Sequence, residues 1–387
     1  MSAAAVDSLL DWYAAEALPL WAGAGFDRDT GAFHEQLGFD RLPVATAPRR
    51  VMVQARQISV FAEAGLDGTF PPGADLAALA GRTLLARWRP AGDAPGWLFS
   101  IGPEPGRSVA TSDLYAHAFV LYALAWLLRL GVPGPFRSAV DRSLDHLERD
   151  FRDPRHGGFW DALPRPDGLR RQNPHMHLFE ALLELSVVLP DERIARLRDE
   201  VLDLALARFV DPEAGTVREL FHEDWTVAPA PGLGSVEPGH QMEWAWLLDR
   251  HAAITGRACP GLPGRLVAAA LATGVDPATG RVVDETGEDG AVRKRSSRLW
   301  PHCEALKALV AEAAAGGMAR AALVEAMAER LRRCYAVAEL GGGWIDQLDE
   351  VDRPVSRTMP ASTLYHLAGA IRSLRSWRRA AVPPVPE

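Results

Sequence analysis

Cysteines, long apolar runs and basic clusters are all scarce in this chain of 387 residues. The 3 cysteines, Cys259, Cys303 and Cys334, are too few and too far apart for a disulfide framework and are typical of a reducing compartment. No apolar run reaches the roughly 18 residues that a membrane span needs. The net charge is −8, and no long block of Lys and Arg residues is present, which argues against a nucleic-acid partner.

The N-terminus also lacks the features of a secretory signal. The residues from Met1 to Val6 carry no basic side chain, and Asp7 and Asp11 interrupt the apolar stretch that follows. A signal peptide needs a positively charged start and an unbroken apolar segment. The sequence therefore predicts a cytoplasmic protein.

Motifs for cofactors and metals are missing as well. The chain has no P-loop, no Gly-x-Gly-x-x-Gly after a strand, no Gly-x-Ser-x-Gly and neither Cys-x-x-Cys nor His-Glu-x-x-His. His175 and His177 are two residues apart, and on a helix such residues point to different sides, so they do not form a metal-binding pair. We expect no nucleotide cofactor and no catalytic metal.

What the chain does contain is a repeat with a period of about 60 residues. In one series, an Arg or His begins an apolar run. Its members are Arg56, His117, His177, His240, His302 and His366. In an offset series, a Gly precedes an apolar or aromatic residue and, in most copies, an acid. These glycines are Gly31, Gly96, Gly157, Gly215, Gly280 and Gly342. Two series with one period indicate six copies of one structural unit.

Each unit contains two kinds of helical pattern. Residues 116–128 and 178–189 are apolar all round, which is typical of an interior helix. Residues 137–151 and 192–209 have charges at i, i+3 and i+4, as solvent-facing helices do. We therefore expect an all-α fold, an (α/α)6 barrel of six helix pairs with short hairpins or loops at the active-site end. Residues 1–380 would form a single domain, followed by a Pro-rich tail at 381–387.

Proline marks the start of four of the expected inner helices, at Pro174, Pro238, Pro301 and Pro360. Proline is favoured in the first helical turn because its missing N–H would have no partner there. The polar residues that follow would therefore lie at helix N-termini, which offer free N–H groups and a positive partial charge. If the repeats close into a ring, these ends surround one cavity, which suits a polyhydroxylated ligand.

Two histidines stand out as acid–base candidates. His240 and Glu243 are three apart and share a helix face, where a carboxylate fixes the tautomer of an imidazole and favours its charged form. His366 lies in an apolar stretch, where a buried histidine bonded to a backbone carbonyl is the plainer interpretation. For an isolated histidine that structural interpretation is the more common one, and the repetition of polar residues at helix starts weakens it here.

Other polar and aromatic side chains near helix starts are candidates for holding a sugar. An aromatic face with neighbouring hydrogen-bonding groups is a common arrangement in such pockets. The candidates are Arg56, Tyr115, His117, Trp300, His302 and Glu304. With 12 tryptophans in the chain, most must serve the core. The basic stretch 292–298 is expected to be a solvated loop with Arg298 nearest the cavity, so the substrate should be a free sugar and not a phosphate ester.

At these residues the chain resembles the N-acylglucosamine 2-epimerase superfamily over nearly its whole length. The resemblance rests on the Arg56 segment, on Asn173-Pro-His-Met-His-Leu-Phe-Glu-Ala and Pro238-Gly-His-Gln-Met-Glu-Trp, and on Leu299-Trp-Pro-His-Cys-Glu-Ala and Gly343-Trp-Ile-Asp with Met359-Pro-Ala-Ser-Thr-Leu-Tyr-His. The last two segments are most similar to the mannose isomerase branch. One departure is His302, where relatives often carry Gln, and this puts the fine substrate preference in question.

The resemblance implies an (α/α)6 barrel that interconverts sugars at C1 and C2 without a metal, using two histidines. By motif they correspond to His240 and His366. The implied sugar-binding residues are Arg56, Tyr115, Asn173, His177, Glu243, Trp300 and Glu304. The implied activity is D-mannose/D-fructose isomerisation of a free monosaccharide through a cis-enediol, with no cofactor.

Three alternatives stay open on the sequence alone. A 2-epimerase would use the same intermediate and return the proton to the opposite face of C2. A glycoside hydrolase would need two carboxylates, for which Glu243 and Glu304 are available. A sugar-binding protein without catalysis would keep the cavity alone. The choice of histidine for each step and the formation of a homo-oligomer also stay open.

Overall fold

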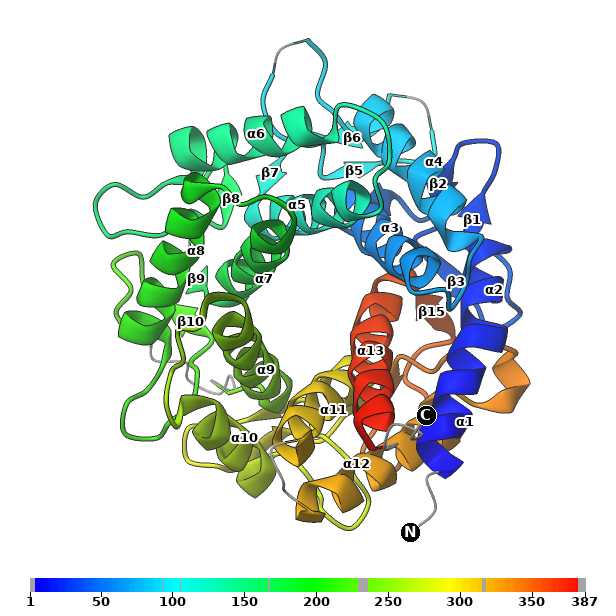
Figure 1. The fold of residues 1–387 in the computed structure, drawn as a ribbon, viewed down its shortest axis with the longest axis vertical. Coiled ribbons are helices and arrows are strands. Elements are labelled where there is room, and N and C mark those ends of the chain that lie inside the picture. Colours follow the sequence, from blue (N-terminus) through cyan, green and yellow to red (C-terminus); the bar gives the residue numbers. More distant parts are fainter. Residues whose placement is uncertain are drawn as a thin grey trace, which may run out of the picture.

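In the computed structural model, which describes residues 4–92, 94–104, 106–165, 168–228, 236–314 and 318–381, the helices form two concentric rings (Figure 1). The inner helices are α3 (Val51–Leu66), α5 (Leu114–Arg129), α7 (Asn173–Val188), α9 (Pro238–Thr255), α11 (Leu299–Ala314) and α13 (Leu364–Ala381). The outer helices are α1 (Ala4–Trp12), α4 (Gly73–Arg87), α6 (Phe136–His146), α8 (Glu192–Leu204), α10 (Leu262–Thr273) and α12 (Met318–Arg330). The expected (α/α)6 barrel is confirmed.

The two rings differ in the way the sequence pattern predicts. In α5, every residue from Ala116 to Leu127 is buried, because this helix packs against α3 and α7 inside the ring. The outer helix α6 buries only one stripe, which includes Phe136, Val140 and Leu144, and it exposes charged residues on its other side. An inner helix must therefore be apolar on nearly all faces, and an outer helix on one.

The N-terminal helix supplies the last outer position, which the repeat alone did not indicate. Helix α1 packs against α12 and α13, so the first helix of the chain is the outer partner of the last inner one (Figure 1). The ring is also closed by the stacked indoles of Trp21 and Trp344, 5.0 Å apart, and by an ion pair of Arg378 with Asp7 at 2.9 Å. The short helix α2 (Leu18–Ala22) carries Trp21.

Very short strands join each unit to the next. They are β1 (Phe26–Asp27), β2 (Ala32–Phe33), β3 (Gln36–Gly38), β4 (Arg49–Arg50), β5 (Ser100–Ile101), β6 (Ser108–Val109), β7 (Ser112–Asp113), β8 (Ala162–Leu163), β9 (Arg170–Arg171), β10 (Leu220–Phe221), β11 (Glu285–Thr286), β12 (Val292–Lys294), β13 (Ser297–Arg298), β14 (Gln347–Leu348) and β15 (Thr358–Pro360). All strand pairings are antiparallel.

These pairings follow one rule around the ring. A residue in the short segment ahead of each inner helix pairs with the loop of the following unit, and the sixth unit pairs with the first. The pairs are Arg50–Ser100, Asp113–Ala162, Arg171–Leu220, Val236–Thr286, Arg298–Gln347 and Pro360–Gln36. Each pairing fixes the start of an inner helix relative to its neighbour, so the helix N-termini are held as a rim at one end of the barrel.

The Gly-containing loops are pinned by polar side chains on the inner helices. The backbone N–H of Phe33 donates to Gln54 at 2.8 Å, that of Phe159 to His175 at 3.0 Å, that of Val217 to Gln241 at 2.6 Å and that of Val282 to His302 at 3.1 Å. Ahead of these residues the chain turns through glycines such as Gly31 and Gly280, both at φ 67°, a conformation that side chains rarely adopt. Gln and His therefore play one structural role at this position.

Aromatic residues of the outer ring contact the outward-facing histidines of the inner helices. Four outer helices end in a π-helical turn: η1 (Tyr13–Ala17), η2 (Leu147–Phe151), η3 (Ala205–Phe209) and η4 (Leu331–Tyr335). Rings from three of these turns contact the outward-facing histidines. The pairs are His117–Phe151 at 5.2 Å, His175–Phe209 at 5.8 Å and His302–Tyr335 at 5.0 Å between ring centroids.

This geometry corrects the sequence interpretation of the six Arg and His residues. Arg56, His177, His240 and His366 face the barrel cavity, whereas His117 and His302 face outward. His302 belongs to the loop anchors, and Nδ1 of His117 lies 2.9 Å from the backbone oxygen of Asp113 at the start of its own helix. The even spacing reflects units of nearly equal length and not equivalent positions. Helix α13 extends to Ala381, and residues 382–387 of the Pro-rich tail lie outside the described residues. None of the described helices has the length and apolar character needed to cross a membrane.

Candidate active site

A cavity of about 240 Å³ opens at the rim where the inner helices begin. It is lined by Arg56, Tyr115, Asn173, His177, Glu237, His240, Glu243, Arg298, Trp300, Asp346, Ser362, Thr363 and His366. Every inner helix contributes at least one of these side chains. The structure thus brings together all the site residues that the family resemblance implied except Glu304.

His240 is held by carboxylates. Its Nδ1 lies 3.0 Å from Oε2 of Glu219 and 4.0 Å from Glu237, and the side chain is 7% exposed. Burial alone would lower the pKa of this imidazole, but Glu219 and Glu237 outweigh that effect and raise the pKa to about 9. His240 is therefore positively charged near neutral pH. Because Nδ1 faces Glu219, Nε2 is the ring nitrogen left for a ligand.

Gln172 fixes the Glu219 carboxylate. The Gln172 amide donates to Glu219 at 2.9 Å, and the indole N–H of Trp244 donates to the Gln172 carbonyl oxygen at 2.8 Å. The indole can only donate, which settles the orientation of the amide. This buried chain from Trp244 to His240 was not visible in the sequence, because Gln172 and Glu219 stand in different units and Glu219 lies in a loop.

His366, by contrast, is neutral. Its Nδ1 lies 2.7 Å from Glu304, and the pKa of the imidazole is well below its usual value because burial and the nearby cations Arg56 and Lys307 disfavour the charged form. A neutral His366 that donates Nδ1–H to Glu304 presents the lone pair of Nε2. The two histidines thus differ in charge within one cavity.

Trp300 contacts both histidines. Its ring centroid lies 5.0 Å from that of His240 and 5.5 Å from that of His366. Gly239 makes room for this ring, since a Cβ there would come within 2.6 Å of it. The indole forms an apolar wall beside the two imidazoles.

Arg56 is a buried cation at the same end of the cavity. Its guanidinium donates to the backbone oxygen of Ser362 at 3.1 Å and to the Tyr115 hydroxyl, and it lies 4.0 Å from the ring centroid of Phe119. The described residues offer it no carboxylate partner, and its Nε has no acceptor among them. A buried cation in this position can stabilise negative charge on a bound oxygen.

A group of buried acids lies around His177. Its Nδ1 is 3.2 Å from Glu180 and 3.8 Å from Glu243, and Tyr365 donates its hydroxyl to Glu180. Burial and the nearby Glu304 raise the pKa of Glu243 well above its usual value, which favours the protonated carboxyl. Neither of its oxygens has a partner among the described residues, which leaves Glu243 free to donate to a ligand.

Glu304 differs from the sequence expectation. It is fully buried and does not line the cavity, because its carboxylate lies behind His366 and forms an ion pair with Lys307 at 2.5 Å. Lys307 is 2% exposed and also lies near Glu180 and Glu243, and these acids keep the pKa of its ammonium group raised against burial. Glu304 therefore acts on the cavity through His366, with Lys307 as its counterion.

Several cavity residues come from loops that sequence reasoning did not single out for a role. They are Glu237, Asp346, Ser362 and Thr363, and all four lie inside or beside the motifs already noted. Arg298 does reach the cavity, as expected. It is paired with Asp284 at 3.1 Å and with Glu237 at 3.2 Å.

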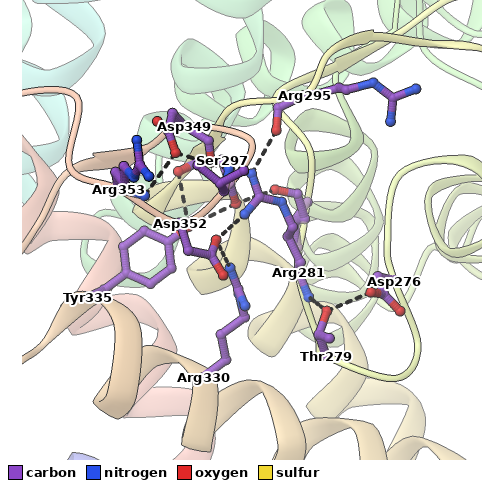
Figure 2. A network of polar contacts seen from close by, with 12 residues as sticks. Asp276, Thr279, Arg281, Arg295, Ser297, Arg330, Tyr335, Asp349, Asp352 and Arg353 are labelled. Carbon is purple, nitrogen blue, oxygen red and sulfur yellow. Dashed lines mark hydrogen bonds and ion pairs between the residues drawn. The ribbon is translucent and has the colours of Figure 1, made fainter.

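A polar network supports the segment that carries Arg298 (Figure 2). Asp352 accepts from Arg281 and from Arg330, the latter at 2.7 Å, and Arg281 also reaches the backbone oxygens of residues 295 and 349. The Tyr335 hydroxyl lies 2.8 Å from that of Ser297, the residue next to Arg298. These contacts hold the outer helix, the loop and the hairpin in place relative to one another behind the cavity wall.

In the described part of the chain, three groups of side chains place possible metal ligands within 4.8 Å of one another: Glu219 with Glu237 and His240, Glu243 with Glu304 and His366, and His177 with Glu180 and Glu243. In each group the histidine Nδ1 already has a carboxylate neighbour. His175 and His177 point to different sides, as the helical spacing requires. The groups thus have the contacts expected of oriented acid–base histidines.

Comparison with known proteins agrees with this fold. The family model described as N-acylglucosamine 2-epimerase matches residues 31–370. A protein named mannose-6-phosphate isomerase from Rhizobium meliloti (strain 1021) is 37% identical over 95% of this chain and 95% of its own length. A D-mannose isomerase from Thermobifida fusca is 30% identical over 77% of this chain and 76% of its own.

A solved structure shares the whole architecture. The crystal structure of a D-mannose isomerase superimposes with a TM-score of 0.84 at 20% identity, covering 97% of this chain and 99% of that chain. With the family model spanning most of the sequence, the chain belongs to the N-acylglucosamine 2-epimerase family and is an enzyme.

Proposed function

We propose that this enzyme interconverts D-mannose and D-fructose by proton transfer between C1 and C2 of the open-chain sugar. The observation that carries the proposal is a pair of histidines in different charge states in one cavity of about 240 Å³, a charged His240 and a neutral His366. Aldose–ketose isomerisation needs one base for a C–H proton and one acid for a carbonyl oxygen, and histidine serves both near neutral pH.

The neutral His366 acts as the base. Its Nε2 takes the proton from C2, the electron pair of that C–H bond forms the C1–C2 double bond, and the former carbonyl oxygen O1 takes a proton from His240. The product of this step is a cis-enediol. Arg56 stabilises the negative charge that develops on oxygen before proton transfer is complete.

The second half returns both histidines to their first state. His240, now neutral, takes the proton from O2 as the C2 carbonyl forms, and His366 gives its proton to C1. One hydrogen has then moved from C2 to C1 and one from O2 to O1. No electron acceptor or metal is needed for this balance, and D-lyxose and D-xylulose could react in the same way.

A free sugar suits the cavity better than a phosphate ester. Of the two arginines in the lining, Arg298 is neutralised by Asp284 and Glu237, and Arg56 lies beside the reacting histidine. Glu237, Glu243 and Asp346 also line the cavity. Glu237 and Asp346 in the lining would repel a phosphate dianion, which favours an uncharged substrate.

The alternative is a 2-epimerase, because the family model carries that description. An epimerase would form the same enediol and return the proton to the opposite face of C2. Incubation with mannose separates the possibilities: fructose as the first product supports isomerisation, and glucose formed without fructose supports epimerisation. Conversion of mannose 6-phosphate with a much higher kcat/KM than mannose would contradict the free-sugar assignment.

A further inference from the structure

A second cavity lies at the other end of the barrel, where the inner helices end. Its volume is about 470 Å³, larger than that of the candidate active site. Arg129 closes α5, Arg250 lies in the last two turns of α9, and Arg372, Arg375 and Arg379 follow one face of α13. These five arginines all line the cavity. We refer to it as the far cavity.

The arginines outnumber the acids that face them. Glu184 is shared by Arg250 and by Arg129 at 3.9 Å. Glu63 pairs with Arg372 at 3.1 Å, and Asp67 with Arg375 at 3.1 Å. Arg379 has no ion pair among the described residues. Five guanidinium groups thus meet three carboxylates, and the far cavity carries a positive charge.

Much of the hydrogen-bonding capacity of this cluster is unused. A guanidinium has five N–H donors, and the ion pairs of Arg129 and Arg250 each use one terminal nitrogen. Within the described part of the chain, the buried Nε of Arg250 and the buried indole N–H of Trp126 have no acceptor. Trp126 is 4% exposed and lines the same cavity. A buried donor without an acceptor is costly, and an anion would supply one.

We propose that the far cavity is a binding site for a phosphate group, carried by inorganic phosphate or by a phosphorylated sugar. Guanidinium groups match phosphate oxygens with paired N–H donors, and several of them around one space provide both charge and geometry. The Trp126 ring, 5.0 Å from the guanidinium of Arg129 and 5.8 Å from that of Arg372, forms an apolar wall beside them. The site is separate from the sugar cavity and does not depend on its proposed function.

The test measures thermal unfolding of the full chain in increasing sodium phosphate, with sodium chloride at matched ionic strength as reference. A ligand that binds only the folded state raises the unfolding midpoint with the logarithm of its concentration. We expect such a rise with phosphate and not with chloride. Parallel titrations with mannose 6-phosphate and with mannose distinguish a free phosphate from a phosphorylated sugar.

Two variants locate the binding. Arg129→Gln and Arg379→Gln remove cations that are exposed enough to be replaced without disrupting the core, and each should weaken the phosphate effect at least about tenfold in concentration, since a charge-assisted contact is worth about 1.5–3 kcal/mol. Arg208→Gln, at an exposed position on η3, removes the same charge elsewhere and should change nothing.

The proposal is overturned if phosphate and chloride act alike on the unmodified protein. It is also overturned if both variants, folded by circular dichroism, keep the full phosphate effect. In either case the arginines serve only the helix C-termini, whose negative partial charge they offset.

Discussion

The Glu219 carboxylate lies 3.0 Å from Nδ1 of His240 and holds a proton on that imidazole well into the alkaline range. The pKa of His240 rises to about 9, whereas burial and the cations Arg56 and Lys307 hold the pKa of His366 well below its usual value. Glu219, together with the more distant Glu237, therefore keeps His240 charged, and the proposed mechanism depends on this difference between the two histidines.

The first prediction concerns the alkaline limb of the pH profile. His240 must be protonated, so kcat/KM should fall as pH rises through about 9. Glu219→Gln removes the charge that holds the proton, so this limb should move to lower pH. Glu200→Gln, which breaks a surface pair with Arg152, is the control and should leave the profile unchanged. An unshifted limb in Glu219→Gln would show that His240 is not the group that titrates.

The second prediction concerns the two histidines as a pair. His240→Ala and His366→Ala should each lower kcat by about 10²- to 10⁴-fold while the fold persists. The double variant should be far less affected than the product of the two losses, because groups that act in one step are not additive. His175→Ala, which removes a loop anchor outside the cavity, should reduce kcat only modestly. Near-normal turnover of a folded His366→Ala enzyme would refute the assignment.

The third prediction concerns the transferred hydrogen. An imidazolium exchanges its proton with solvent, so a reaction in D₂O should place deuterium at C1 of fructose formed from mannose. Mass spectrometry or proton NMR of the product measures this. Product free of deuterium would indicate a direct hydride shift from C2 to C1 and would remove the base role of His366.

The fourth prediction concerns His302, which accepts the backbone N–H of Val282 at 3.1 Å just as Gln241 accepts that of Val217. His302→Gln should keep both stability and substrate preference. His302→Ala leaves a buried donor without a partner and should cost about 1–3 kcal/mol in the free energy of unfolding. Urea denaturation measures the cost, and sugar-panel kinetics check the preference. A changed preference in His302→Gln would restore a direct role in specificity.

The fifth prediction concerns metal ions. Because the proposed proton transfers use only His240, His366 and Arg56, activity should survive prolonged EDTA treatment followed by gel filtration. Metal content of the treated enzyme is checked by atomic absorption. Loss of activity that a divalent cation restores would point to the His and Glu groups around the cavity as metal ligands and would replace the two-histidine mechanism.

The period of about 60 residues and the two kinds of helix were sufficient to predict the barrel, because a helix apolar all round must be enclosed by others. The motifs also identified eight residues that meet in the cavity. The periodicity does not show which way each residue points around the axis of its helix. His117 and His177 look alike in sequence, yet His117 faces outward toward Phe151 and His177 faces the cavity.

Only the tertiary structure decided the electrostatics of the site. Glu219 reaches His240 from a loop 21 residues earlier in the chain. Glu304 reaches His366 from the neighbouring helix, 62 residues earlier, and Lys307 forms a buried ion pair with Glu304. The sequence alone determined which residues could ionise. Which of them is charged depends on burial and on neighbours contributed by other units, and those are fixed only when six helix pairs close into a ring.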